Sequence, residues 1–71
     1  MSNRHHFKNS SSLVHVDYDD DKGTMEICFA SGGTYHYPNC DKAHYENLKQ
    51  AASAGQYFHR AIRNLPSKKV S

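Results

Sequence analysis

Polar and apolar residues alternate over three short segments between residues 13 and 37, and this alternation constrains the fold more than any other feature of the chain. Successive side chains of a β-strand point to opposite faces of a sheet, so alternation predicts a strand with one buried face. The expected strands are residues 13–18, 24–29 and 34–37. The side chains expected on the buried face are Val14, Val16 and Tyr18, then Met25, Ile27 and Phe29, then Tyr35 and Tyr37.

Two tight turns separate these segments. Residues 19–23 end in Gly23, which can adopt a positive φ, and residues 31–33 include Gly32 and Gly33. Pro38 has no backbone N–H to donate to a neighbouring strand, so the third strand is expected to end there. Short connections join antiparallel neighbours, and the sequence therefore predicts a three-stranded antiparallel meander.

Beyond residue 38 the apolar spacing changes to that of helices. Asn39 or Asp41 is expected to cap a helix that starts near Lys42, because a short side-chain acceptor satisfies the N–H groups of the first turn. Gly55 is expected to end this helix as a C-cap or a corner between helices. The residues expected to face the sheet are Tyr45, Leu48 and Ala52.

A second helix is predicted from about residue 56 to residue 64, and Pro66 should stop it. Its apolar residues, at helical spacing, are Phe58, Ile62 and Leu65. The sequence thus predicts an α+β domain of order β-β-β-α-α, with both helices packed on one face of the sheet. The expected core cluster between the layers consists of Phe29, Leu48, Phe58 and Ile62.

The chain has 71 residues, which suits one small domain. Apart from Met1, residues 1–10 hold one large apolar residue, Phe7, so burial is not expected to offset the entropy of ordering them. We therefore expect a mobile N-terminal tail over 1–10, a folded domain over 11–65 and a flexible C-terminal tail over 66–71.

Composition excludes several classes of protein. No run approaches the roughly 20 apolar residues of a membrane-spanning helix, and MSNRHHFKNSSS lacks the apolar core of a secretory signal. Two cysteines make at most one disulfide, too few for a stapled secreted scaffold. We expect a cytoplasmic protein without a membrane partner.

Charge is distributed unevenly along the chain. Residues 1–40 hold three Lys or Arg and five Asp or Glu, whereas residues 41–71 hold six and two. A basic half of this kind attracts phosphate or an acidic protein surface, although it also fits an ordinary solvated helical face. The second half is therefore where a nucleic-acid site is expected.

The second predicted helix carries the candidate nucleic-acid site. Gln56, Arg60 and Arg63 lie on the face away from its apolar residues, and guanidinium groups suit phosphate oxygens. Arg63 is equally compatible with a helix cap or an ion pair to Glu46. The other candidate contacts are His59 at the edge of the same helix, Lys42 and Lys49 on the preceding helix, and the possible base-stacking rings Tyr35 and Tyr37.

The two tyrosines have two readings. As exposed rings they would stack on the bases of a single strand. Their shared face with Ile27 and Phe29 favours core packing instead, with only the hydroxyl groups reaching solvent.

Taken in order, the segments SSSLVHVDYD, TMEICFASGGTYHYP and AHYENLKQAASAGQYFHRAIRN resemble the KTSC domain family. The family marker Y-x-Y is matched by Tyr35, His36 and Tyr37, and an A-x-S-x-G-x-Y/F-F-x-x-x-I-R segment is matched by residues 51–63. The resemblance covers residues 11 to about 64. It implies a short bacterial or phage domain, also found at the C-terminus of some lysyl-tRNA synthetases, which is uncharacterised and for which RNA binding is suggested.

Metal binding and catalysis are not expected. Cys28, His36, Cys40 and His44 have no recognised zinc spacing, although Cys28 and His36 could meet on the open sheet face beside His15. The aspartates of residues 17–21 lack the glycine and the bidentate glutamate of a calcium loop. A Cys–His nucleophile pair would lack an oxyanion hole and a deep pocket. We expect no cofactor and no enzyme activity.

The leading hypothesis is a non-catalytic accessory domain that binds nucleic acid, with RNA preferred, through the basic face of its C-terminal helices. The alternative is a protein-interaction or regulatory module that uses its open sheet face or an edge strand. Both are compatible with a monomer or a weak homodimer.

Overall fold

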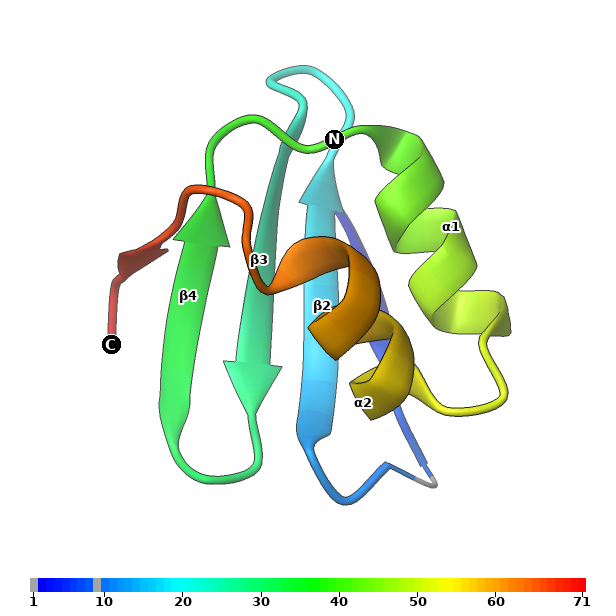
Figure 1. Cartoon of the computed structure of the whole chain (residues 1–71). Helices are drawn as coiled ribbons and strands as arrows, with labels where there is room; N and C mark the ends of the chain where they lie inside the picture. The colour runs from blue at the N-terminus through cyan, green and yellow to red at the C-terminus, as the bar shows by residue number, and fades with distance from the viewer. Residues whose placement is uncertain (1, 9) are drawn as a thin grey trace.

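Five strands form one antiparallel sheet in the spatial order β1-β2-β3-β4-β5 (Figure 1). The computed structural model describes residues 2–8 and 10–71. The strands are β1 Ser2–His6, β2 Leu13–Asp19, β3 Thr24–Phe29, β4 Gly33–Tyr37 and β5 Lys68–Lys69. The helical elements are α1 Lys42–Gln50, α2 Ala54–Tyr57 and a single π turn, η1, over Phe58–Ile62 that continues α2.

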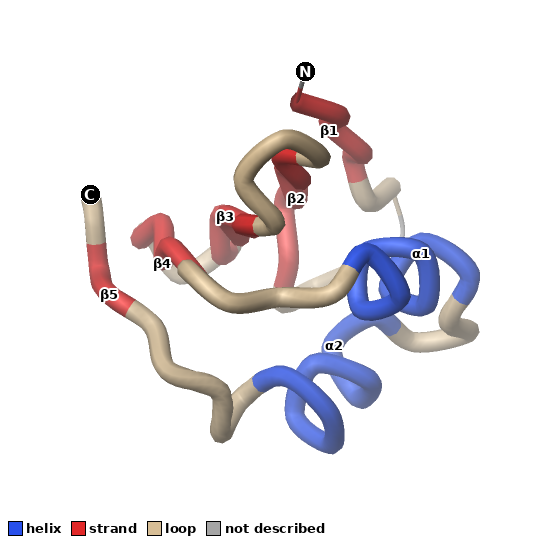
Figure 2. Tube along the Cα trace, turned by 90° about the horizontal axis from the view of Figure 1, so that it is seen from above, coloured by secondary structure: helices blue, strands red, loops and turns tan. Residues whose placement is uncertain are grey.

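The helices lie on one face of the sheet and leave the other face open, as the view along the sheet shows (Figure 2). The α+β architecture with two helical segments on one antiparallel sheet is thus confirmed. None of the helices in the described part of the chain is long and apolar enough to cross a membrane.

The prediction of three strands is wrong in number, because residues assigned to the two tails form strands β1 and β5. β1 pairs with β2 over its whole length, and Arg4 reaches across to Asp17 with two hydrogen bonds of 2.7 and 2.9 Å. An edge strand is held by backbone hydrogen bonds to its neighbour, and its polar side chains can remain in water. A segment of low hydropathy can therefore form such a strand. Met1 and Asn9 of the expected tail lie outside the described residues.

Cross-strand rows of apolar side chains build the sheet side of the core. Tyr18, Met25 and Tyr37 are aligned in one row, and Val16 and Ile27 in the next. Tyr18 stacks on Tyr45 of α1 at 5.6 Å between centroids. The fully buried large side chains are Leu13, Val16, Met25, Ile27, Leu48 and Ile62.

The expected core cluster is confirmed for Leu48 and Ile62, which are fully buried. Phe29 and Phe58 pack against that core but are only partly buried. Val14, expected inside, is 40% exposed, because an irregularity in β2 between Leu13 and His15 shifts the pairing and turns Leu13 inward instead.

The helix boundaries also differ from the prediction. α1 ends at Gln50, so Ala52 is exposed and the buried alanine is Ala54. Gly55 lies inside the second helix rather than capping the first, and that helix begins at Ala54 because the Ser53 hydroxyl accepts the Gln56 N–H at 3.3 Å. Asp41 occupies the N-cap position of α1 without a side-chain capping hydrogen bond.

Candidate nucleic-acid interface

A groove with an aromatic floor lies between β4, the turn before it, η1 and the C-terminal segment. We call it the aromatic groove. It is lined by Phe29, Ser31, Gly32, Gly33, Tyr35, Tyr37, Phe58, Arg63, Ser67 and Lys69. The groove thus joins the β3–β4 hairpin to η1 and to strand β5, both of which are far from that hairpin in the sequence.

The floor is a network of edge-to-face rings. Phe29 contacts Phe58 at 5.1 Å and Tyr35 at 5.5 Å between centroids, with the planes 72° and 83° apart. All three rings are partly buried, which leaves aromatic surface open to the groove. Such surface is what the bases of a single strand stack on.

The two tyrosines of the Y-x-Y segment have different environments. Tyr37 is 2% exposed and belongs to the core, as its pattern favoured, whereas Tyr35 is partly exposed at the groove. Burial raises the pKa of the Tyr37 phenol, and a hydrogen bond with Ser67 partly opposes this effect. Of the pair, Tyr35 is therefore the stacking candidate.

Two cationic side chains, Arg63 and Lys69, line the groove beside these rings. Neither forms an ion pair within the described part of the chain. The Lys69 side chain lies close to Gly33, since a Cβ built at Gly33 would be in ordinary contact with the Lys69 Cε at 3.6 Å. The expected alternative partner of Arg63, Glu46, pairs with Lys49 instead, at 2.9 Å.

Arg60 and Gln56 do not share a hollow with Arg63. They line a separate hollow with Asn47 and Tyr57, and the Arg60 guanidinium lies 5.9 Å from the centre of the Tyr57 ring. The Arg63 N–H bonds to the Phe58 carbonyl at 2.8 Å, an i→i+5 bond that widens this turn. Residues three apart are then rotated further from each other than on an α-helix, so the single basic face predicted from α-helical spacing is divided.

Lys42 and Lys49 are held by carboxylates. Lys42 lies 3.3 Å from Asp20 and Lys49 lies 2.9 Å from Glu46 and 4.5 Å from the centre of the Tyr45 ring. The hydrogen bond to Glu46 raises the pKa of Lys49. These two predicted contacts are therefore less suited to phosphate than the unpaired cations of the groove. His59 is exposed beside the Phe58 ring, at 5.6 Å between centroids.

The groove also contains residues outside the predicted site. Phe29 and Phe58 were assigned to the core, and Ser31, Ser67 and Lys69 to turns and a tail. The pairing of β4 with β5, in which Tyr35 lies opposite Lys69, brings Lys69 to the groove, and a ring contact joins Phe29 to Phe58. No pattern in the sequence predicts a two-residue strand.

The cysteine and histidine side chains are dispersed. Cys28 lies opposite His15 on one side and Thr34 on the other, whereas His36 lies opposite Glu26, with its Nδ1 3.3 Å from a Glu26 carboxylate oxygen. Cys40 is buried, and this burial raises its pKa to about 11, so it stays a thiol at neutral pH. In residues 2–8 and 10–71 no three His, Cys, Asp or Glu side chains gather closely enough to hold a metal ion.

The comparisons with known proteins agree with this architecture. The family model of the KTSC domain matches residues 9–65. The crystal structure of KTSC domain protein YPO2434 from Yersinia pestis is similar over 100% of both chains, with a TM-score of 0.90 and 28% sequence identity. No curated protein matches the chain. The protein belongs to the KTSC domain family.

Proposed function

We propose that this protein is a non-catalytic module that binds single-stranded nucleic acid, with RNA preferred, in the aromatic groove. The observation that carries the proposal is the partly exposed ring surface of Phe29, Tyr35 and Phe58 beside the cations Arg63 and Lys69, in a groove with no Asp or Glu among the described residues that line it. Bases would stack on the rings while Arg63 and Lys69 contact phosphates.

RNA is favoured by the hydroxyl groups at the groove. Ser31, Ser67 and Tyr35, each of which carries a hydroxyl group, line it. Hydroxyl groups can both donate to and accept from a ribose 2′-hydroxyl, which DNA lacks.

The open sheet face supports the protein-interaction alternative less well. Its central row runs across all five strands as Arg4, Asp17, Glu26, His36 and Lys68. Arg4 is paired with Asp17, and His36 lies beside Glu26, so much of this charge is matched within the sheet. The exposed large apolar side chains of the described residues are Val14 and Val70, too few for an apolar docking patch.

The test uses neighbouring lysines that point to opposite faces of the sheet. Lys69 lies opposite Tyr35 on the groove side, whereas Lys68 lies opposite His36 on the open side. Lys69→Gln should weaken binding of a labelled single-stranded RNA and lower the salt dependence by about one phosphate contact between about 50 and 200 mM salt. Lys68→Gln removes the same charge and should change binding much less, as measured by fluorescence anisotropy.

Arg63→Gln should weaken RNA binding and lower its salt dependence as Lys69→Gln does. Single-stranded DNA of the same sequence should bind more weakly than RNA. Equal effects of Lys68→Gln and Lys69→Gln would mean that only net charge matters and would count against the groove. Absence of binding at low salt would remove the proposal and favour a protein partner.

A further inference from the structure

The two ends of the sheet differ in how well they are protected from a further strand. Proteins block strand addition with very short edge strands, bulges, prolines and charged side chains. At one end β5 has only two residues, Lys68–Lys69. At the other end β1 has five, Ser2–His6, which contain neither proline nor glycine and pair with β2 without a bulge. The longer edge is therefore that of β1, which Figure 2 shows at the opposite end of the row of strands from β5.

The backbone of β1 presents N–H and C=O groups along this edge. The Phe7 N–H donates to the Val14 carbonyl at 3.0 Å, so the backbone of Phe7 faces β2. Hydrogen bonding alternates along an antiparallel strand, and the backbone groups of His5, two residues earlier, therefore face β2 as well. Those of Arg4 and His6 point the other way. A further strand can pair with them without breaking any bond between β1 and β2.

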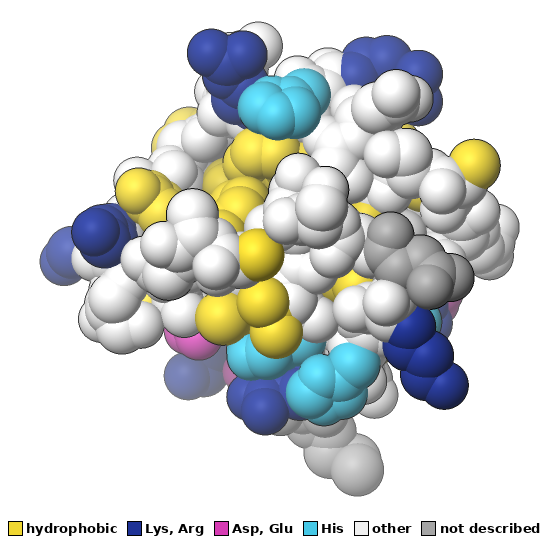
Figure 3. Space-filling view, turned by 90° about the horizontal axis from the view of Figure 1, so that it is seen from below, with side chains coloured by type: hydrophobic (Ala, Val, Ile, Leu, Met, Phe, Trp, Pro, Cys, Tyr) yellow, Lys and Arg dark blue, Asp and Glu magenta, His cyan; other side chains and the backbone are white. Residues whose placement is uncertain are grey.

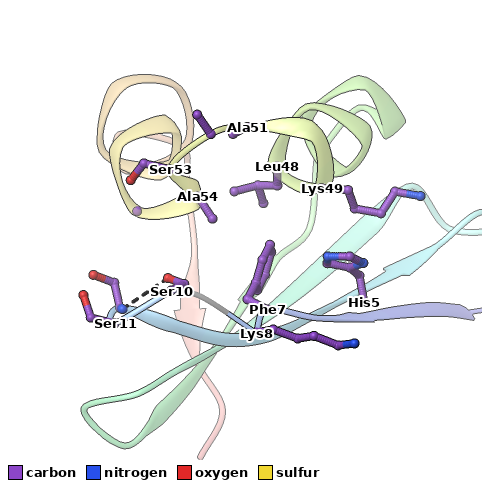
Figure 4. Close-up of a pocket in the computed structure, with 13 residues that line it drawn as sticks. His5, Phe7, Lys8, Ser10, Ser11, Leu48, Lys49, Ala51, Ser53 and Ala54 are labelled. Atoms are coloured by element: carbon purple, nitrogen blue, oxygen red, sulfur yellow. Dashed lines mark hydrogen bonds between the residues drawn. The ribbon is translucent and has the colours of Figure 1, made fainter.

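The side chains of β1 and of the two residues after it point alternately to the two faces of the sheet. His5 and Phe7 point toward the helices, with 4.9 Å between their ring centroids, whereas the Lys8 side chain lies on the other side of the strand (Figure 4). Arg4 is on that open face too, where it reaches Asp17. A strand added at this edge would therefore have rings beside it on one face and cations on the other.

The helical face beside β1 suits apolar side chains of a partner. The rings of His5 and Phe7 are partly buried, and they line a hollow together with the buried Leu48 and Ala54. Residues directly opposite each other on neighbouring strands have Cβ atoms about 5 Å apart. An aliphatic side chain opposite His5 would therefore contact these rings and cover part of their exposed surface.

The charge of the edge favours an acidic partner over a second copy of this chain. Residues 2–8 contain Arg4 and Lys8 and no Asp or Glu. Arg4 is paired with Asp17 at 2.7 Å, whereas Lys8 is exposed and has no ion pair within the described residues. Two β1 strands side by side would bring only cations to their shared edge, which opposes self-pairing.

The surface at the end of β1 has the same character. Figure 3 views the end of the molecule that carries the connection from β1 to β2, where Lys, Arg and His side chains surround apolar ones and acidic side chains show little. A partner with acidic side chains is complementary to this surface.

We propose that the free edge of β1 binds an extended segment of a partner protein as an additional strand, and that acidic and apolar residues alternate in this segment. The acidic side chains lie on the open face beside Lys8, and the apolar ones lie on the helical face beside His5 and Phe7. This contact is at the opposite end of the sheet from the aromatic groove and does not depend on it. The module then has separate places for a protein and for nucleic acid.

The experiment uses a labelled peptide of about seven residues in which Glu and Val alternate, a length that matches one strand. It is titrated against the full chain by fluorescence anisotropy, and a peptide with Lys in place of Glu is the control. Lys8→Glu should weaken binding of the Glu peptide by about fivefold, the upper value for an exposed ion pair. Lys22→Glu makes the same change of charge at an exposed lysine in the turn between β2 and β3, and should have little effect.

Hydrogen exchange tests the geometry at single amides. In the free protein the amides of Arg4 and His6 should exchange faster than that of His5 between them. The Glu peptide should slow the exchange of Arg4 and His6 and leave that of His5 little changed, because only N–H groups at the free edge gain a partner. His6→Pro removes one of these groups and should weaken peptide binding by about tenfold, while β1 stays paired with β2.

Each outcome decides for or against the added strand. It is wrong if the Glu and Lys peptides bind equally, if Lys8→Glu and Lys22→Glu act alike, or if the Arg4 and His6 amides stay unprotected at saturating peptide. If His6→Pro also exposes the His5 amide, β1 has detached, and the two lysine variants decide instead.

Two further measurements separate this contact from its alternatives. Protection of the Arg4 and His6 amides that grows with protein concentration alone would identify a second copy as the occupant and overturn the proposal, as would displacement of the peptide by single-stranded RNA. Lys69→Gln, which tests the aromatic groove, should leave peptide binding unchanged. Failure of one proposal therefore leaves the other standing.

Discussion

At the scale of single residues, two tyrosines on one strand face differ because only one is covered. Tyr35 and Tyr37 both point toward the helical layer, and Tyr37 lies 6.5 Å from Phe58 between ring centroids. Tyr35 is the middle residue of β4, and its ring stays partly exposed next to Phe29. The same alternation thus yields one core residue and one groove residue.

We expect Tyr35→Ala to weaken RNA binding by about 1–3 kcal/mol, the value of one base stacked on an aromatic ring. Tyr35→Phe should retain most of the affinity, because it keeps the ring and removes only the hydroxyl. Anisotropy titrations at one salt concentration measure both, and thermal melts check folding. If Tyr35→Phe is as damaging as Tyr35→Ala, the hydroxyl rather than the ring makes the contact.

At the scale of elements, the second helix is joined to the sheet by a close approach at Gly55. A Cβ built there would lie 3.1 Å from the Ser12 hydroxyl oxygen, tighter than ordinary van der Waals contact. The absence of a side chain allows the helix to sit against the start of β2. Here the lack of a side chain eases a close contact, whereas the turn glycines Gly23 and Gly32 allow positive φ values of 64° and 94°.

We expect the effect of Gly55→Ala on stability to depend on residue 12. Alanine favours a helix over glycine by about 1 kcal/mol, but in the wild type the contact with Ser12 offsets this gain. In a Ser12→Ala background the gain should appear as a higher free energy of unfolding. Denaturant melts of the two single variants and the double variant measure the coupling. Equal effects of Gly55→Ala in both backgrounds would contradict the close approach.

At the scale of the whole molecule, two weakly acidic side chains from distant parts of the chain, Tyr18 and Cys40, are buried where β4 leads into α1. The Tyr18 hydroxyl donates to the Cys40 carbonyl at 3.1 Å, and burial raises the pKa of both side chains, that of Cys40 to about 11 from an ordinary value of 9.0. The folded state thus favours the protonated thiol. The unfolded chain loses that proton first as the pH rises.

We therefore expect the free energy of unfolding to fall as pH rises above about 9, by about 1.4 kcal/mol per pH unit at most for one such group. The loss from Cys40 should be complete once pH passes about 11. Cys40→Ala should reduce the slope between these values. Urea melts at several pH values measure the slope. A slope unaffected by Cys40→Ala would show that the thiol is not the group that titrates.

Much of the fold follows from the sequence alone. Alternation at residues 24–29 and 34–37, glycine at the turns and proline at residue 38 act through neighbours in the chain, so β3, β4 and their hairpin could be predicted. The start of α1 at Lys42 and the burial of Leu48 and Ile62 follow from helical spacing for the same reason. The KTSC resemblance also depends only on the order of such segments.

Only tertiary structure decided where the candidate site lies. β1 and β5 exist because a partner strand supplies their hydrogen bonds, and the π turn at Phe58–Ile62 separates Arg60 from Arg63 against their α-helical spacing. Lys69 reaches Tyr35, and Ser12 reaches Gly55, across contacts between residues distant in sequence. Local patterns report the conformation of a segment, whereas a groove between segments depends on packing that no single segment contains.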